Sequence, residues 1–158
     1  MLTRHEMRER ALQALYQIDL GGASPQQAVV DVLAEDDNVQ IRTVGYVQEL
    51  VSGVSINLDV VDTVLKQALE GWQLDRVASV ERNILRLAVY EIMVERDLDI
   101  ATILDEAVRL AKDFSGNESG RFVNGVLAKV ISIHPDREVL AQSVWKTITP
   151  EDDSEPGH

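Results

Sequence analysis

The chain has 158 residues, no cysteine, and 27 acidic against 15 basic side chains, which gives a formal net charge of −12. This length suits one domain, and a hydrophobic content of 45% supplies enough apolar surface for a core. The missing cysteine excludes disulfides, thiol catalysis and cysteine metal sites, and the acidic balance excludes nonspecific coating of nucleic acid through a dominant basic field.

The first two helices are predicted from apolar spacing and from their ends. Gly21 and Gly22 mark the end of the first helix, and Ser24 and Pro25 supply an N-cap and a first helical residue for the second. Gln27 stands where it can close a capping box, and the second helix should extend to about residue 35. The apolar face of the first helix consists of Met7, Ala11, Ala14, Leu15 and Ile18.

The third and fourth helices are also amphipathic. Valines spaced by three and four predict a helix around residues 44–54 that ends near residues 55–57. The next stripe predicts a helix over residues 58–72, with Trp72 as its last apolar member.

Three further helices complete the predicted set of seven. The fifth begins near Ser79 and is apolar around most of its circumference through residue 93, so we expect it at the buried centre of a bundle. Thr102 is the expected N-cap of the sixth helix, which carries Leu104, Ala107, Val108, Ala111 and Phe114 on its apolar face, and Ser115 is the expected N-cap of the seventh. Gly125 lies inside the seventh helix and predicts a close helix contact there.

The predicted architecture is therefore all-α, with a helical domain over residues 1–133. Residues 134–158 are acidic and lack a core pattern, so we expect a disordered tail, in which residues 139–148 have the composition of a short, loose helix. The charged start and the lack of about 18 consecutive uncharged residues predict a cytoplasmic protein without a membrane span.

The sequence does not predict an enzyme, a metal site or a cofactor. The histidines at positions 5, 134 and 158 are too scattered to predict a ligand cluster from their spacing. Gly116 and Gly120 lack the Gly-Lys-Ser/Thr ending of a phosphate-binding loop.

The first helix has a second patterned face. His5, Arg8, Leu12 and Tyr16 lie away from the main apolar stripe, with Arg4 at its border. Arginine beside an exposed aromatic ring suits single-stranded RNA, because rings stack on unpaired bases while guanidinium groups bind phosphates. Composition alone favours the other interpretation, in which Leu12 and Tyr16 pack against a second layer of helices.

Four stretches resemble the bacterial transcription antitermination factor NusB family. They occur in the order and spacing of that family across residues 1–133, and they comprise residues 8–17 (Arg-Glu-Arg-Ala-Leu-Gln-Ala-Leu-Tyr-Gln), 80–91 (Val-Glu-Arg-Asn-Ile-Leu-Arg-Leu-Ala-Val-Tyr-Glu), 105–112 (Asp-Glu-Ala-Val-Arg-Leu-Ala-Lys) and 122–127 (Phe-Val-Asn-Gly-Val-Leu).

The resemblance implies a seven-helix bundle of two packed helical subdomains, three helices followed by four. It also implies binding of the boxA element in nascent ribosomal RNA transcripts together with NusE, a small-subunit ribosomal protein. The pair would join other Nus factors on RNA polymerase and suppress termination. By analogy, the RNA-binding candidates are Arg4, Arg8, Gln13, Tyr16, Ser119, Arg121 and Lys129, and the partner-binding candidates in the second subdomain are Glu81, Arg82 and Tyr90.

Two other classes of function are also open, a protein-only interaction module and an enzyme. Only Arg4 precedes Arg8, where many family members are richer in Arg and Lys, so fewer phosphate contacts predict weak RNA binding by this chain alone. Weak RNA binding favours an alternative function, in which the chain is a protein-only interaction module, such as a homodimer that masks its RNA face. Ribosomal RNA cytosine methyltransferases also carry a NusB-like domain, but no nucleotide-binding βαβ unit follows here.

Overall fold

The computed structural model describes residues 2–36 and 39–142. This part of the chain contains no strand, so the all-α prediction is confirmed. Its helices are α1 (Arg4–Gly21), α2 (Pro25–Leu33), α3 (Ile41–Ile56), α4 (Leu58–Ala68), the short 3-10 helix η1 (Leu74–Arg76), α5 (Ser79–Val94), α6 (Ile100–Ser115), α7 (Asn117–Ile133) and α8 (Arg137–Ala141).

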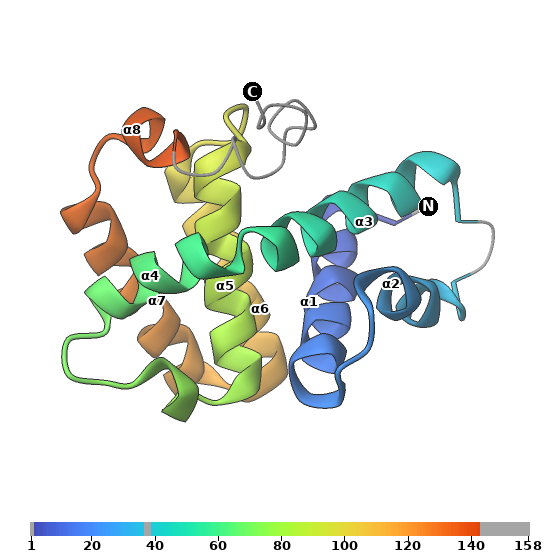
Figure 1. The fold of residues 1–158 in the computed structure, drawn as a ribbon, viewed down its shortest axis with the longest axis horizontal. Coiled ribbons are helices and arrows are strands. Elements are labelled where there is room, and N and C mark those ends of the chain that lie inside the picture. Colours follow the sequence, from blue (N-terminus) through green and yellow to red (C-terminus); the bar gives the residue numbers. More distant parts are fainter. Residues whose placement is uncertain (1, 37–38, 143–158) are drawn as a thin grey trace, which may run out of the picture.

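The helices form two lobes, as the resemblance implied, but in the described residues the second lobe holds five α-helices where four were expected. Helices α1, α2 and α3 make one lobe, and α4 to α8 make the other, with α3 and α4 running almost end to end between them (Figure 1). Every residue from 83 to 93 of α5 is buried, which confirms this helix as the centre of the bundle. None of the described helices is both long enough and apolar enough to cross a bilayer.

The ends of α1 and α2 follow local capping chemistry. Thr3 and Glu6 form a complete capping box at the start of α1. The predicted N-cap at Ser24 is confirmed, because its hydroxyl accepts a hydrogen bond from the Gln27 backbone. The Gln27 side chain instead donates to Asp31, so the capping box predicted there is wrong.

The predicted N-caps of α6 and α7 are also wrong. Asp99 caps α6 by accepting from the Thr102 backbone, since a carboxylate one turn earlier satisfies the free amides at the helix start. Ser115 is the last residue of α6, and α7 follows directly from Gly116, whose φ of +93° favours glycine.

The helical domain extends past the predicted boundary at residue 133. Arg137 donates from Nε to the Ile92 carbonyl and from Nη1 to the Leu98 carbonyl, at 2.9 and 2.6 Å. These bonds fix α8 against the end of α5, and Leu140 is buried. The boundary at 133 was therefore too early, while residues 143–158, where the rest of the expected tail lies, are outside the described residues.

The two lobes meet closely where α3 crosses α5. A Cβ atom at Gly53 would overlap the ring and hydroxyl of Tyr90. Gly125, by contrast, has open space where its Cβ would stand, so the close contact expected there is wrong. The close approach of α3 to α5 therefore depends on Gly53.

Candidate nucleic-acid interface

The first turn of α1 presents Arg4 to solvent. The capping box of Thr3 and Glu6 fixes where the helix starts, and the Arg4 guanidinium carbon lies 5.5 Å from the centre of the Tyr46 ring. A cation over an aromatic face at this distance is attracted to it while its N–H groups stay available. Arg4 is therefore positioned by α3 and remains exposed.

Arg8 has a different environment from the one expected of an RNA ligand. Its side chain is only 2% exposed, and its Nε donates to both carboxylate oxygens of Glu91, at 3.1 and 2.9 Å. Burial raises the pKa of Glu91 to about 7, although the charge and hydrogen bonds of Arg8 lower it. This buried ion pair joins α1 to α5, so the Arg8 guanidinium does not face solvent.

Gln13 and Tyr16 line a surface groove of about 790 Å³. We call it the α1 groove; its other lining residues include Leu12 of α1, Val80 of α5 and Phe114 of α6. Tyr16 and Phe114 are each 41% exposed. Leu12 is buried, which confirms the packing interpretation for that residue, whereas Tyr16 keeps a face open to solvent. Two half-exposed rings beside an amide suit stacking on unpaired bases.

The rim of the α1 groove is acidic. Asp31, Glu35 and Asp36 line one side. Arg10 also lines the groove but donates from Nε and Nη2 to Asp36, at 2.8 and 2.9 Å. The hydrogen bond from Arg10 lowers the pKa of Asp36. The groove thus offers stacking surfaces with little basic charge of its own.

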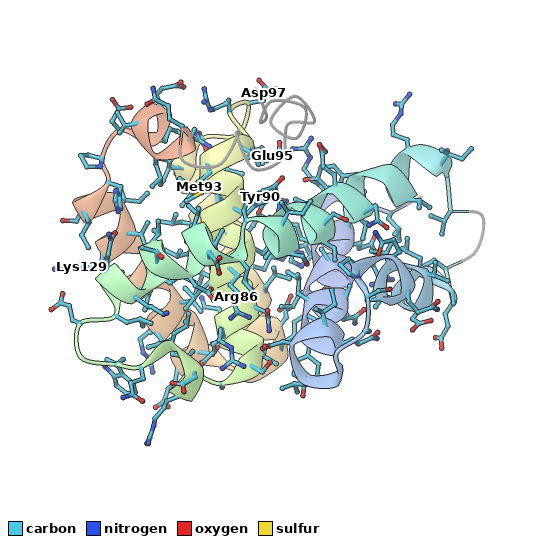
Figure 2. All side chains as sticks on the ribbon, in the orientation of Figure 1. Arg86, Tyr90, Met93, Glu95, Asp97 and Lys129 are labelled. Atoms are coloured by element: carbon cyan, nitrogen blue, oxygen red, sulfur yellow. The ribbon has the colours of Figure 1, made fainter. Side chains whose placement is uncertain are left out.

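None of the candidates on α7 lines the α1 groove. Ser119 is buried, and its hydroxyl has no hydrogen-bond partner among the described residues. Arg121 is exposed. Lys129 binds Glu70 at 2.7 Å and lies at the edge of the lobe opposite α1 (Figure 2). Of the seven RNA-binding candidates, the geometry therefore brings together Gln13 and Tyr16 in one groove, with Arg4 exposed at the start of the same helix.

Glu81 lines a second groove, of about 350 Å³, which we call the Trp72 groove. Trp72 and Phe122 form an edge-to-face pair there, with ring centres 6.2 Å apart, and Arg76 and Ser119 also line it. Exposed aromatic side chains flanked by charges are typical of protein-binding surfaces.

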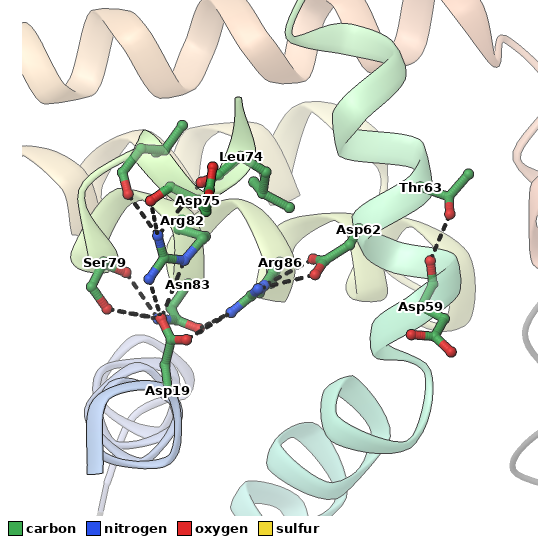
Figure 3. Close-up of polar contacts among 11 residues, drawn as sticks. Asp19, Asp59, Asp62, Thr63, Leu74, Asp75, Ser79, Arg82, Asn83 and Arg86 are labelled. Carbon is green, nitrogen blue, oxygen red and sulfur yellow. Dashed lines mark hydrogen bonds and ion pairs between the residues drawn. The ribbon is translucent and has the colours of Figure 1, made fainter. Parts of the chain in front are cut away.

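The other two partner-binding candidates serve the fold. Arg82 donates to Asp19 at 2.6 Å and to the Val77 carbonyl at 2.8 Å, within a network that includes Asn83 and Arg86 (Figure 3). Burial raises the pKa of Asp19, but the hydrogen bonds from Arg82 and its neighbours lower it by more, so the carboxylate stays charged.

Tyr90 is also committed to the core, where it packs on Gly53. Burial raises the pKa of Tyr90 to about 12. Glu81 thus lines the Trp72 groove, whereas Arg82 lines another groove, of about 750 Å³, in which its guanidinium is bound to Asp19.

The sequence analysis identified Tyr16 but not Phe114 in the α1 groove, nor Trp72 in the second groove. It placed Phe114 and Trp72 on apolar helix faces, but Phe114 lies in the last turn of α6 and Trp72 lies beyond the end of α4. Gly71, with a φ of +88°, follows that helix and was a signal that it ends before Trp72.

Comparison with known proteins gives consistent matches. The NusB family model matches residues 5–132. The transcription antitermination protein NusB of Geobacillus kaustophilus is 46% identical over 129 residues, which cover 82% of this chain and 95% of that protein. The NusB of Salinispora tropica is 38% identical over 130 residues, covering 82% and 96%.

Solved structures agree with these sequence matches. T. maritima NusB is 32% identical and superposes with a TM-score of 0.79, covering 87% of this chain and 96% of that chain. A crystal structure of antitermination factors NusB and NusE in complex with dsRNA contains a chain that is 27% identical, with a TM-score of 0.75 and coverage of 84% and 100%.

Proposed function

Because the chain belongs to the NusB family, we propose that it is a transcription antitermination factor that binds boxA-type RNA of ribosomal RNA transcripts together with NusE. The shared fold with a NusB that is solved in complex with NusE and dsRNA supports both partners. Other Nus factors and RNA polymerase would be reached indirectly, through this pair.

The α1 groove is the observation that carries the RNA assignment. It places Tyr16 and Phe114, both half-exposed, beside the Gln13 amide, so bases can stack and form hydrogen bonds at one place. Arg4, at the start of the same helix, supplies an exposed cation for the RNA backbone. We propose Arg4, Gln13 and Tyr16 as the RNA contacts, with Arg121 as an exposed candidate on α7.

Arg8 and Ser119 have other surroundings in this proposal. Arg8 holds α1 against α5 through Glu91 and so acts by positioning the helix that carries the contacts. Ser119 is buried at the edge of the Trp72 groove. Lys129 lies with Glu70, away from α1.

The Trp72 groove is the proposed contact for NusE. The chain carries a net charge of −12, so a basic ribosomal protein is a complementary partner and can supply phosphate-binding charge that the α1 groove lacks. Glu81 and Glu118 line this groove beside the exposed Trp72 and the half-buried Phe122, and they provide carboxylates for basic side chains of NusE.

The proposed role is binding without bond making or breaking, in the cytoplasm, where transcription takes place. Two open grooves with stacking and ion-pairing side chains support recognition rather than catalysis. No cofactor is required for that role.

A transcription assay tests this function. A template with boxA upstream of a terminator is transcribed with RNA polymerase, the Nus factors and this chain. Read-through should rise when the chain and NusE are both added, should not rise on a template with scrambled boxA, and should fall with Tyr16→Ala. Equal read-through on both templates would contradict the proposal.

A further inference from the structure

His5, in the first turns of α1, is surrounded by three carboxylates. Its Nδ1 lies 2.7 Å from Oε1 of Glu106, and its Nε2 lies 3.5 Å from both Oε2 of Glu9 and Oδ2 of Asp113. Glu9 is one helical turn beyond His5 on α1, whereas Glu106 and Asp113 come from α6. The sequence argument against a metal site considered only the spacing of histidines, so it missed carboxylates contributed by another helix.

The spacing of these atoms matches the ligands of a tetrahedral metal ion. Metal–nitrogen and metal–oxygen bonds of about 2.0–2.2 Å at a tetrahedral angle place neighbouring ligand atoms about 3.4 Å apart. The two distances from Nε2 are 3.5 Å, and the ligand atoms of His5, Glu9 and Asp113 all lie within 4.8 Å of one another. Three ligands are therefore near their final positions without rearrangement.

The orientation of the imidazole points to the same use. A carboxylate that accepts from Nδ1–H leaves the Nε2 lone pair facing outward, which is how metal-binding histidines are commonly held. Glu106 occupies that position, and Nε2 is buried with no hydrogen-bond partner among the described residues. An Nε2 lone pair that faces two carboxylate oxygens is repelled by them, and a cation bound between them removes that repulsion.

Solvent access to the cluster suits a cation. Arg8 and Arg109 approach Glu106, at 3.8 and 3.9 Å, and Arg10 approaches the other oxygen of Glu9 at 3.9 Å, but Arg8 and Arg10 form shorter ion pairs with Glu91 and Asp36. The side chains of His5 and Asp113 are 12% and 49% exposed, so a buried nitrogen faces a carboxylate that is open to solvent. An ion can enter past Asp113 and keep a water in its fourth position.

We propose that His5, Glu9 and Asp113 bind a divalent transition-metal cation of the zinc type, with Glu106 orienting the imidazole. Imidazole combined with carboxylates suits zinc better than calcium or magnesium, which prefer oxygen ligands alone. The ion would join the first turns of α1, which begins at Arg4, to the last turn of α6, and so fix the start of the helix.

Calorimetric titration of the full chain with Zn²⁺ tests the site, with Co²⁺ as a second probe whose visible spectrum reports tetrahedral coordination. All proteins carry His158→Gln, so that the C-terminal imidazole does not contribute. His5→Gln and Asp113→Asn remove ligands. Matched controls are His134→Gln, which removes an imidazole that contacts Gln67, and Asp105→Asn, which removes an exposed carboxylate from the same helix α6.

We expect one ion per chain, loss of binding in both ligand variants, and a fall in affinity of about tenfold or more in Glu106→Gln. The thermal midpoint should rise with Zn²⁺ in the parent chain and in the two controls, but not in the two ligand variants. Asp113→Asn decides the question if His5→Gln fails to fold, since Asp113 is half-exposed. Equal Zn²⁺ binding by the ligand variants, or no saturable binding by the parent chain, would overturn the proposal.

Discussion

The buried ion pair between Arg8 and Glu91 makes a prediction that separates a structural role from RNA contact. In Arg8→Met the remaining Glu91 carboxyl can take up a proton, because burial already raises its pKa to about 7. In Glu91→Gln the Arg8 charge stays, because a guanidinium does not lose its proton in proteins. Glu91→Gln should therefore be the more destabilising of the two variants.

The size of the effect follows from the burial of both groups. Removing one partner of a buried pair costs about 3–5 kcal/mol, so we expect about 3 for Arg8→Met and about 5 for Glu91→Gln. At about 2–4 °C per kcal/mol for a chain of this size, the thermal midpoint should fall by about 6–20 °C. The double variant Arg8→Met/Glu91→Leu should recover most of this loss, since apolar pairs replace buried ion pairs at little cost.

Urea unfolding followed by far-UV circular dichroism measures these free energies, and RNA titration of the same proteins provides the comparison. We expect the double variant to regain both stability and RNA affinity. If Arg8→Met unfolded at the wild-type midpoint but lost RNA affinity, or if the double variant were stable yet unable to bind RNA, Arg8 would be a phosphate ligand and the reasoning would be refuted.

Three further predictions concern stability and partner binding. A raised pKa means that folded Glu91 holds its proton to higher pH than unfolded Glu91, so the stability advantage of the wild type over Glu91→Gln should narrow as the pH rises from about 4.5 to 7, as measured by urea unfolding at several pH values. Gly53→Ala should cost about 1–3 kcal/mol in the same measurement, because its Cβ overlaps Tyr90, whereas Gly125→Ala should stabilise by about 0.5–1 kcal/mol. Glu81→Ala should weaken NusE binding in calorimetry and leave the unfolding midpoint unchanged. Arg82→Ala should mainly lower the unfolding midpoint. The reverse pattern would reject the roles assigned to the two residues.

The helices and their order could be predicted from the sequence because apolar periodicity is local, and the apolar faces that it marks are the ones that pack in the core. The fully apolar α5 is the buried centre of the fold, and Ser24 caps α2. Caps depend on competition between neighbouring residues, so Asp99 displaced Thr102 at the start of α6. Gly53 and Gly125 both stand within helices, and only the approach of α5 makes one of them necessary.

The candidate interfaces were less predictable because charge alone does not give exposure. Arg8 and Tyr16 share a helix face, but α5 supplies Glu91 opposite Arg8, while Tyr16 faces the α1 groove. Arg82 resembles a surface arginine in sequence, yet Asp19 lies 63 positions away in the chain and binds it. Such pairings arise from tertiary packing, which one sequence does not display.

Fluorescence anisotropy of a labelled boxA-type strand tests the central claim most directly. The strand is titrated with the chain alone and with NusE, at two salt concentrations, using the wild type, Tyr16→Ala and the control Lys129→Ala. The account predicts sequence-selective binding that NusE strengthens, that Tyr16→Ala weakens and that Lys129→Ala leaves nearly unchanged. Equal binding of boxA and a scrambled strand in the presence of NusE would contradict it and would favour a protein-only interaction module.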